Sequence, residues 1–249
     1  MRKLMAYCKE QNITKELMIA YKEHLRRKGY CTSSINSFLV AANRFFDYMG
    51  WQDVKIKTFR LQKKVYLPEE KELTREEYKR LVRAAREQDR ARMGMLLETI
   101  CATGIRVGEL RFLTVQSLTR GEIKIYHKGK ERIVLLPKKL RLKLMIYVKK
   151  QGITAGSIFV TKNGAPMDRT YIWREMKKLC SLSGVPEEKV YPHNLRALFA
   201  RTYYDLFKDI AKLADILGHS NIETTRIYIK TPYSEHRRQL DRMKLLVGQ

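Results

Sequence analysis

The chain has 249 residues, and 51 lysines and arginines against 26 acidic residues give it a formal net charge of +25. Such an excess predicts a polyanionic partner. Nucleic acid is favoured, and a ribosomal surface or an anionic lipid surface is the alternative. A hydrophobic content of 44% excludes a disordered chain, and no apolar run approaches the roughly 20 residues that a membrane span needs, so we expect a soluble, intracellular protein.

The cysteines and histidines give no sign of a metal site or of disulfides. The four cysteines contain no Cys-x-x-Cys pair, and the five histidines show no zinc-ligand spacing. We therefore expect reduced, mostly buried thiols. The cysteines are Cys8, Cys31, Cys101 and Cys180.

The first 51 residues have the apolar spacing of helices, interrupted at Gly29 and Gly50. Thr32 and the two serines after it predict the start of the second major helix. Residues 52–72 then alternate between basic and apolar types and end in a proline and an acidic cluster. We predict a small helical domain over residues 1–51 and a linker over residues 52–72.

A second domain is predicted to begin at Leu73. Thr74 and Glu77 have the spacing of a capping box, in which the threonine and the glutamate each bond the backbone of the other. Leu73 can also pack against Tyr78 across the first turn. These signals predict a helix that begins directly after Thr74.

The later elements alternate with turns. Residues 121–127 and 132–136 predict two short strands of a hairpin whose tip, residues 128–130, is basic. The chain ends in a basic amphipathic helix over residues 234–246. Other helices are expected over residues 92–102 and 140–148 and from Val107, Asp168, His193, Asp209 and Asn221. The predicted fold class is mainly α with a small β-sheet or hairpin (α+β).

Several polar residues follow these turns, and each has an ordinary structural explanation. An arginine after a glycine turn or a lysine at a hairpin tip is usually a solvated cation. A histidine at a helix end usually bonds the backbone, and most tyrosines belong to the core or the surface. The residues are Arg106, Lys128, His193, Arg196, His219 and Tyr228.

In their order and local spacing, these residues resemble the catalytic motifs of the tyrosine recombinase (phage integrase) family. The spacing of nine positions from His219 to Tyr228 is the most specific part of the resemblance. The motifs are Thr103-Gly104-Ile105-Arg106-Val107-Gly108-Glu109-Leu110, Lys128 in a hairpin, His193-Asn194-Leu195-Arg196, Leu217-Gly218-His219 and Tyr228.

The resemblance covers essentially the whole chain and assigns roles to the predicted parts. It implies a helical, SAM-like core-binding domain over residues 1–51 and a catalytic domain over residues 73–232. It also implies that residues 233–249 form a C-terminal helix that neighbouring protomers can exchange. Packing of that helix on its own domain is the alternative.

The resemblance implies that Tyr228 attacks a DNA phosphodiester and becomes joined to the 3′ phosphate. Arg106 and Arg196 would hold the non-bridging oxygens, because guanidinium groups can clamp oxygens that gain negative charge during the attack. Glu109 would keep the first arginine in place, and His219 would hydrogen-bond the scissile phosphate.

Two proton transfers accompany this chemistry. A phenol with a pKa near 10 attacks poorly unless a neighbour accepts its proton or stabilises the phenolate, and His193 is the candidate. The departing 5′ oxygen needs a proton, for which Lys128 is the candidate. Lys130 remains an alternative acid, since both lysines flank the same turn. Ala197 stands where many relatives carry another histidine, outside the catalytic set.

The expected activity is site-specific DNA recombination or integration through a 3′-phosphotyrosyl intermediate and a Holliday junction. A type IB topoisomerase and a non-catalytic DNA-binding regulator are the alternatives, and the sequence leaves integration, dimer resolution and inversion open. The chain is short for a relative with an added arm-binding domain, so it corresponds either to a minimal recombinase or to a shortened chain.

The resemblance also predicts partners and location. The partners would be double-stranded DNA recombination sites, on which a homotetramer assembles. No cofactor or metal is expected, because the phosphotyrosine conserves the energy of the broken bond and side chains stabilise the charge. We expect a cytoplasmic, nucleoid-associated protein without membrane contact.

Overall fold

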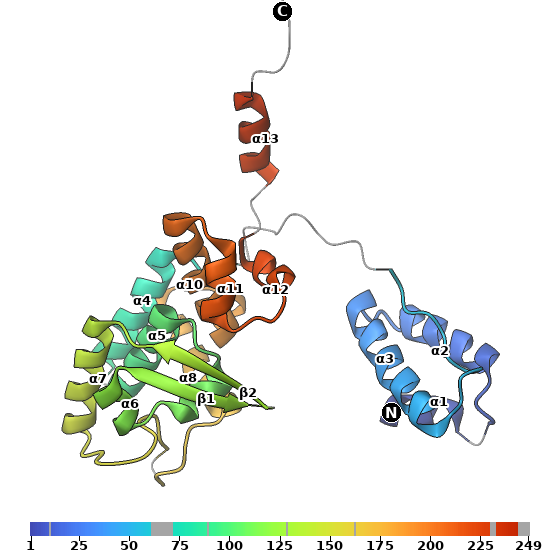
Figure 1. The fold of residues 1–249 in the computed structure, drawn as a ribbon, viewed down its shortest axis with the longest axis horizontal. Coiled ribbons are helices and arrows are strands. Elements are labelled where there is room, and N and C mark those ends of the chain that lie inside the picture. Colours follow the sequence, from blue (N-terminus) through green and yellow to red (C-terminus); the bar gives the residue numbers. More distant parts are fainter. Residues whose placement is uncertain are drawn as a thin grey trace, which may run out of the picture. The chain divides into compact units, whose positions relative to one another are not determined.

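A computed structural model describes residues 1–9, 11–60, 72–88, 90–127, 129–161, 163–229 and 233–243 (Figure 1). The chain divides into two compact units, residues 1–64 and residues 65–249. Each unit has a hydrophobic core of its own. No helix among the described residues is long and apolar enough to cross a membrane.

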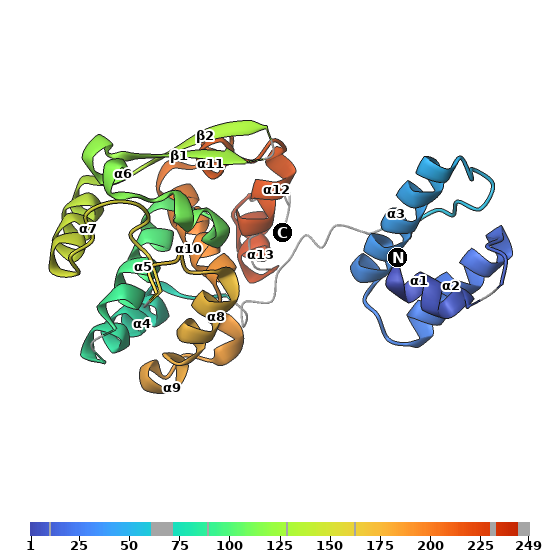
Figure 2. The same ribbon diagram turned by 90° about the horizontal axis from the view of Figure 1, so that it is seen from below.

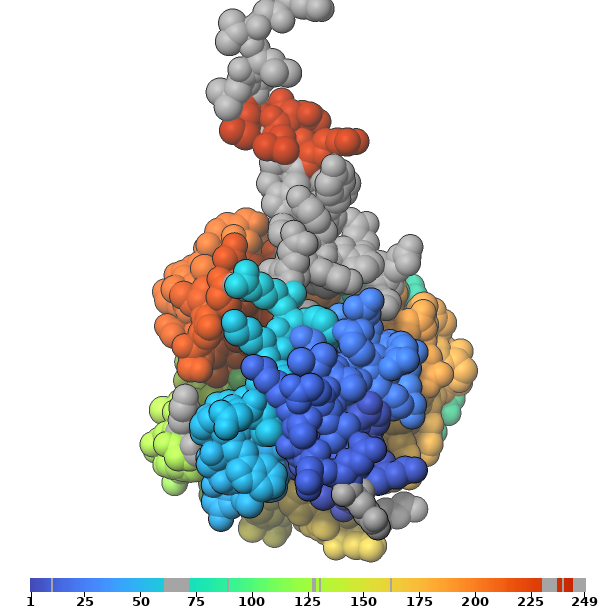
Figure 3. All heavy atoms as spheres, turned by 90° about the vertical axis from the view of Figure 1, so that its right-hand side faces the viewer, coloured from blue at the N-terminus to red at the C-terminus, as the bar shows by residue number. Residues whose placement is uncertain are grey.

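The first unit is helical: α1 (Arg2–Cys8), α2 (Lys15–Arg27) and α3 (Thr32–Met49). Thr14 caps α2 by accepting a hydrogen bond from the backbone N–H of Leu17 at 3.2 Å. The apolar faces of the three helices meet in one core, and the unit packs as a single body in the space-filling view (blue to cyan in Figure 3). The core residues are Leu4, Cys8, Met18, Tyr21, Leu25, Ile35, Leu39, Ala42, Phe46 and Ile56.

Residues 52–60, which we expected to belong to a linker, lie along α3. Asn36 exchanges two hydrogen bonds with the backbone of Phe59, at 2.8 and 2.9 Å. Two turns further along the same face of α3, Asn43 does the same with the backbone of Ile56, at 2.9 and 3.4 Å. The side-chain amides of two asparagines thus supply hydrogen-bond partners to the backbone N–H and C=O groups of Ile56 and Phe59. The first unit therefore extends beyond Trp51.

The second unit begins with α4 (Arg75–Glu87), and here the predicted capping box is present. Thr74 Oγ1 accepts from the N–H of Glu77 at 3.1 Å, and the Glu77 carboxylate accepts from the N–H of Thr74 at 2.8 Å. The next helix, α5 (Ala91–Thr103), is buried along most of its length and packs against α4, α7 (Lys138–Lys150) and α10 (Pro192–Phe207). It forms the centre of the unit's core.

A two-stranded antiparallel sheet covers one side of this core. The strands β1 (Glu122–His127) and β2 (Lys130–Leu135) follow the 3₁₀ helix η2 (Val107–Phe112) and the short helix α6 (Val115–Arg120). Their register pairs Glu122 with Leu135 and His127 with Lys130. The second strand thus begins two residues earlier than expected, because the turn between the strands is tight.

The remaining helices complete the unit. Two views show β1 and β2 beside α11 (Ile210–Leu217), although some 80 residues separate them in the chain (Figures 1 and 2). The last helix ends at Arg242, whereas the predicted helix ended at residue 246. Residues 244–249 lie outside the described part. The other elements are α8 (Arg169–Lys177), α9 (Cys180–Ser183), η3 (Glu187–Lys189), α12 (Ile222–Arg226), η4 (Ile227–Ile229) and α13 (Tyr233–Arg242).

The predicted fold class is confirmed: the described residues are mainly helical, with one two-stranded sheet. All four cysteines are free thiols, of which Cys8 and Cys180 are buried and Cys31 is exposed.

Candidate active site

The turn after α5 places Arg106 and Glu109 side by side. Gly104 ends α5 in the left-handed conformation, with φ of 63°, and the chain then enters η2 through Arg106. Glu109 accepts two hydrogen bonds from Arg106, one from its backbone N–H and one from Nη1, both at 3.0 Å. Because the glutamate is buried and the arginine is 42% exposed, the carboxylate holds the guanidinium at the surface of the site.

Arg196 lies on α10 and is 2% exposed. Its guanidinium donates to the carbonyl oxygens of Gly104 and of Leu217, the latter at 2.7 Å. Burial, followed by the charge of Arg106, lowers the pKa of Arg196 to about 10, while the neighbouring Tyr228 hydroxyl raises it. Arg196 therefore remains charged at neutral pH, in a fixed position close to Arg106.

His219 follows the C-terminal turn of α11 and lies between Arg196 and Thr225. Its Nε2 is 2.9 Å from Arg196 Nη2, and its Nδ1 is 2.8 Å from Thr225 Oγ1. An arginine can only donate, so Nε2 accepts and the ring proton on Nδ1 points to the threonine. Burial, then the charges of Arg196 and the other site arginines, lower the pKa of His219 to about 4, so the ring is neutral near pH 7.

Tyr228 lies in η4 and is only 6% exposed. Its ring centroid is 5.3 Å from that of His193 and 5.9 Å from that of His219, with the His219 ring nearly parallel at 20°. Its hydroxyl interacts with Arg196. The phenol thus lies among the residues that the sequence motifs single out, and all of them belong to one chain.

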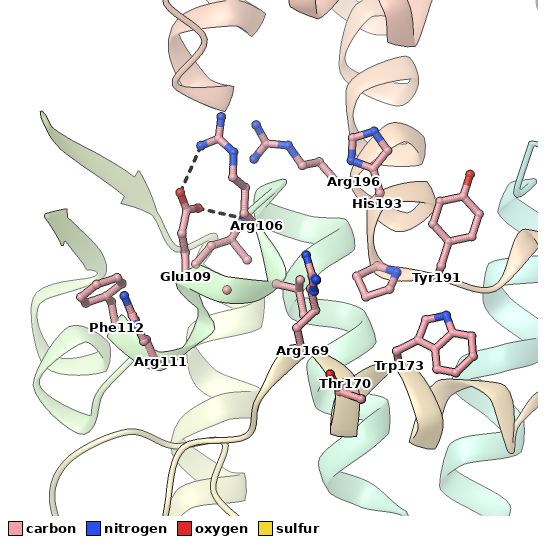
Figure 4. Close-up of a pocket in the computed structure, with 14 residues that line it drawn as sticks. Arg106, Glu109, Arg111, Phe112, Arg169, Thr170, Trp173, Tyr191, His193 and Arg196 are labelled. Atoms are coloured by element: carbon pink, nitrogen blue, oxygen red, sulfur yellow. Dashed lines mark hydrogen bonds and ion pairs between the residues drawn. The ribbon is translucent and has the colours of Figure 1, made fainter. Parts of the chain in front are cut away.

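A cavity of about 920 Å³ opens beside these residues. Arg106, His193 and Arg196 line it from one side, and Arg169 and Trp173 of α8 from another (Figure 4). Desolvation, then the charges of Arg196 and Arg106, lower the pKa of His193, so that this histidine of the cavity lining is neutral at pH 7 and able to accept a proton. The guanidinium groups of Arg106 and Arg196 at the cavity suit a ligand with anionic oxygens.

The structure brings six of the seven candidate residues together, and it does not test the seventh. Lys128 and the side chain of Lys130 lie outside the described residues. Among the described residues, no cluster of three or more His, Cys, Asp or Glu side chains is placed to hold a metal ion. The residues that meet are Arg106, Glu109, His193, Arg196, His219 and Tyr228.

Two neighbours of the site were not singled out in the sequence. Arg132 of β2 donates to the Glu109 carboxylate, and Thr225 is fully buried against His219. Thr225 lies six residues after His219 and three before Tyr228, a helical spacing that could have indicated it. For Arg132, only its place in a strand next to the candidate lysines gave a signal.

Comparison with known proteins identifies the family. The model of the phage integrase family matches residues 71–235. Among curated relatives, the tyrosine recombinase XerA of Thermococcus kodakarensis is 31% identical over 92% of this chain and 81% of its own length. The tyrosine recombinase XerD of Proteus mirabilis is 31% identical over 81% of this chain and 69% of its own length.

Solved structures agree with this assignment. A crystal structure of XerA recombinase covers 99% of this chain and 89% of its own, with a TM-score of 0.61 and 25% identity. The structure of XerH bound to a palindromic difH substrate, a post-cleavage complex, aligns over 92% of this chain and 70% of its own, with a TM-score of 0.73. Because the identity is 22%, this likeness supports the fold alone. The chain belongs to the phage integrase family and is a tyrosine recombinase, an enzyme of site-specific DNA strand transfer.

Proposed function

We propose that Tyr228 is the nucleophile and that Arg106 and Arg196 form the clamp for the scissile phosphate. The phenolic oxygen attacks phosphorus and displaces the 5′ oxygen of the next nucleotide, which leaves as a hydroxyl after taking up a proton. The product is a 3′-phosphotyrosyl bond. A 5′ hydroxyl of the partner strand then attacks the same phosphorus and releases the tyrosine, so the number of phosphodiester bonds is conserved.

The two histidines have different tasks in this proposal. His193 is neutral and exposed to the cavity, and it accepts the phenolic proton. Once the phosphate accepts the Arg196 Nη2 hydrogen bond in place of His219 Nε2, the ring proton moves from Nδ1 to Nε2 and is donated to the phosphate, while the Thr225 hydroxyl donates to Nδ1. Glu109 holds Arg106 throughout. Lys128 protonates the leaving oxygen, and Lys130 is the alternative donor.

One observation carries the proposal: the phenol of Tyr228 lies next to Arg196 and between the rings of His193 and His219, within the same chain. A tyrosine kept only for packing has no need of two neutral imidazoles and a buried cation around it. The arrangement supports cleavage in cis, by the tyrosine of the protomer that binds the phosphate.

The partners follow from the reaction. Homologues of this chain have been solved on recombination-site DNA, among them XerH on difH and lambda integrase on a core site. We propose that the helical unit at residues 1–64 is a core-binding domain, and that four protomers pair two DNA sites through a Holliday junction. Such a substrate would place the protein at the cytoplasmic nucleoid.

The helix α13 is the candidate connection between protomers. On this helix and the residue after it, Leu240 and Met243 are 66% and 55% exposed, as expected for a segment that docks on a neighbour. Truncation before Ser234 should then abolish the pairing of two sites while leaving the binding of one site intact. Unaltered synapsis and recombination would refute this role.

A plasmid assay tests the reaction as a whole. The probe is a plasmid with two copies of the sequence that the protein enriches from a pool of random duplexes. A recombinase excises or inverts the intervening segment, and the Tyr228→Phe variant does not. If the plasmid gives only relaxed topoisomers without exchange, the protein acts as a topoisomerase and the proposal fails.

A further inference from the structure

Three successive carbonyl groups at the C-terminal end of α11 are each bound by a different arginine. Arg132 Nη1 donates to Ile216 O at 3.1 Å, and Arg196 Nη2 donates to Leu217 O at 2.7 Å. Arg106 Nη2 donates to Gly218 O at 3.3 Å. The last carbonyls of a helix have no partner within the helix and carry the negative end of its dipole, so this turn can hold three like charges together.

Arg132 differs from the other two arginines because it does not face the cavity. Its side chain is 15% exposed, and it is not among the residues that line the cavity, whereas Arg106 and Arg196 are. One of its terminal nitrogens binds the Glu109 carboxylate and the other binds the carbonyl of Ile216. A single side chain of β2 therefore joins the turn that carries Arg106 to the end of α11.

Arg132 packs closely against Gly218. A Cβ atom at Gly218 would lie 2.5 Å from Arg132 Cδ and 3.0 Å from its Nη1, closer than real contacts allow. The backbone at this glycine has a φ of 63°, a left-handed conformation that glycine adopts without strain. The arginine thus lies directly against Gly218, the residue whose own carbonyl binds Arg106.

We propose that Arg132 is a positioning residue of the phosphate clamp, which holds Glu109 and the α11 turn so that Arg106 is presented to the scissile phosphate. The inference rests on the proposed function of Arg106. Arg132 does not touch the DNA in this role. It acts through Glu109, and it also ties β2, the second strand of the Lys128 hairpin, to the rest of the site.

The electrostatics of Glu109 agree with this role. Burial raises its pKa, but the charge and hydrogen bond of Arg132 and the two hydrogen bonds from Arg106 outweigh burial and lower it. Arg132 is the larger of the two influences. Without it, Glu109 would be a buried carboxylate with one half-exposed partner, free to turn and to take Arg106 with it.

The test compares Arg132→Met, which keeps an unbranched apolar stem and removes the guanidinium donors, with the unaltered full chain. The probe is a nicked duplex that carries the sequence enriched by the unaltered protein, and single-turnover formation of the covalent adduct is measured together with DNA affinity. We expect adduct formation about 100-fold slower, as for a reacting group displaced by about 1 Å. DNA affinity should change by less than about threefold, since the phosphate contacts elsewhere remain.

Arg141→Met is the matched control. Arg141 is also half-buried, donates to a single backbone carbonyl (Thr119 O, 2.9 Å) and has a buried Nε without a partner, but it has no contact with Glu109. Adduct formation within about twofold of the unaltered rate is expected, because such a substitution is distant from the clamp. Equal rates for Arg132→Met and Arg141→Met would overturn the inference.

A double-substitution cycle separates positioning from direct contact. If Arg132 acts through Glu109, adding Glu109→Gln to Arg132→Met slows the reaction little further. Multiplicative defects would contradict that path. If Arg132→Met does not fold, Arg132→Lys decides: one ammonium cannot bridge both acceptors, so slow cleavage at normal affinity supports the inference and normal cleavage refutes it. Failure of the unaltered protein to form any adduct would instead overturn the proposed function.

Discussion

The contact between Thr225 and His219 predicts a measurable effect of removing one hydroxyl group. Thr225 is fully buried, and its Oγ1 is the acceptor for the Nδ1 proton of His219 at 2.8 Å. Thr225→Val keeps the shape and leaves this N–H without a partner. The ring cannot simply move its proton to Nε2, because Arg196 already donates there at 2.9 Å.

An unsatisfied buried donor costs about 1–3 kcal/mol, so the free energy of unfolding should fall by about that amount. The loss in catalysis follows from the hydroxyl's ability both to accept and to donate. When Nε2 turns to the phosphate as a donor, Nδ1 becomes an acceptor, and the threonine can then donate to it, whereas valine cannot. Losing the same bond in the transition state would slow cleavage about 5- to 150-fold.

The assay is chemical denaturation together with single-turnover cleavage of the nicked duplex. Thr225→Ser should retain most of the stability and rate, because the hydroxyl remains. Thr224→Val is the matched control, since this adjacent threonine is exposed. If Thr225→Val cleaves DNA at the unaltered rate, the threonine does not orient His219 and the reasoning is wrong.

Three further predictions follow from the site. Arg106→Ala and Arg196→Ala should each slow cleavage about 100- to 1000-fold with DNA binding largely kept, and a loss of affinity equal to the loss of rate would contradict their roles in the transition state. Gly104→Ala should lower the free energy of unfolding by about 2–4 kcal/mol, because its Cβ would lie 2.5 Å from an aromatic ring at a φ of 63°. The control Gly152→Ala has a φ of 64° and open space, so about 1 kcal/mol is expected in the same denaturation experiment, and equal losses would exclude the steric cause. Because the pKa of His219 falls from 6.5 to about 4 on folding, the unfolded chain binds the extra proton between these values, and the free energy of unfolding should decrease as pH falls from 6.5 to 4. The slope should be shallower in His219→Gln.

The parts that the sequence predicted are those specified by local contacts. The capping box of Thr74 and Glu77 joins residues three apart, and the left-handed turn at Gly104 depends on one residue type. The order of the motifs also predicted the candidate site, because the resemblance to a known family indicates which residues, distant in the sequence, lie together in the fold. Periodicity and turn signals alone could not have predicted that Arg106 contacts Gly218, which is 112 residues away in the sequence.

The parts that were missed depend on contacts between distant segments. Asn36 and Asn43 have an ordinary spacing on a helix, and nothing in their sequence shows that they bind the backbone of residues 56–59. Arg132 resembles any basic residue of an exposed hairpin until the fold brings Ile216 and Glu109 to it. In a chain with 51 basic residues, charge alone cannot distinguish the few that are buried and bridging.

The central claim is that the phenol of Tyr228 becomes joined to DNA within the clamp of its own chain. The most direct measurement is mass spectrometry of the adduct formed with the nicked duplex, after digestion of both protein and DNA. We predict a nucleotide on the peptide that contains Tyr228, and no adduct from Tyr228→Phe. A nucleotide on any other residue, or an undiminished adduct from that variant, would contradict the account.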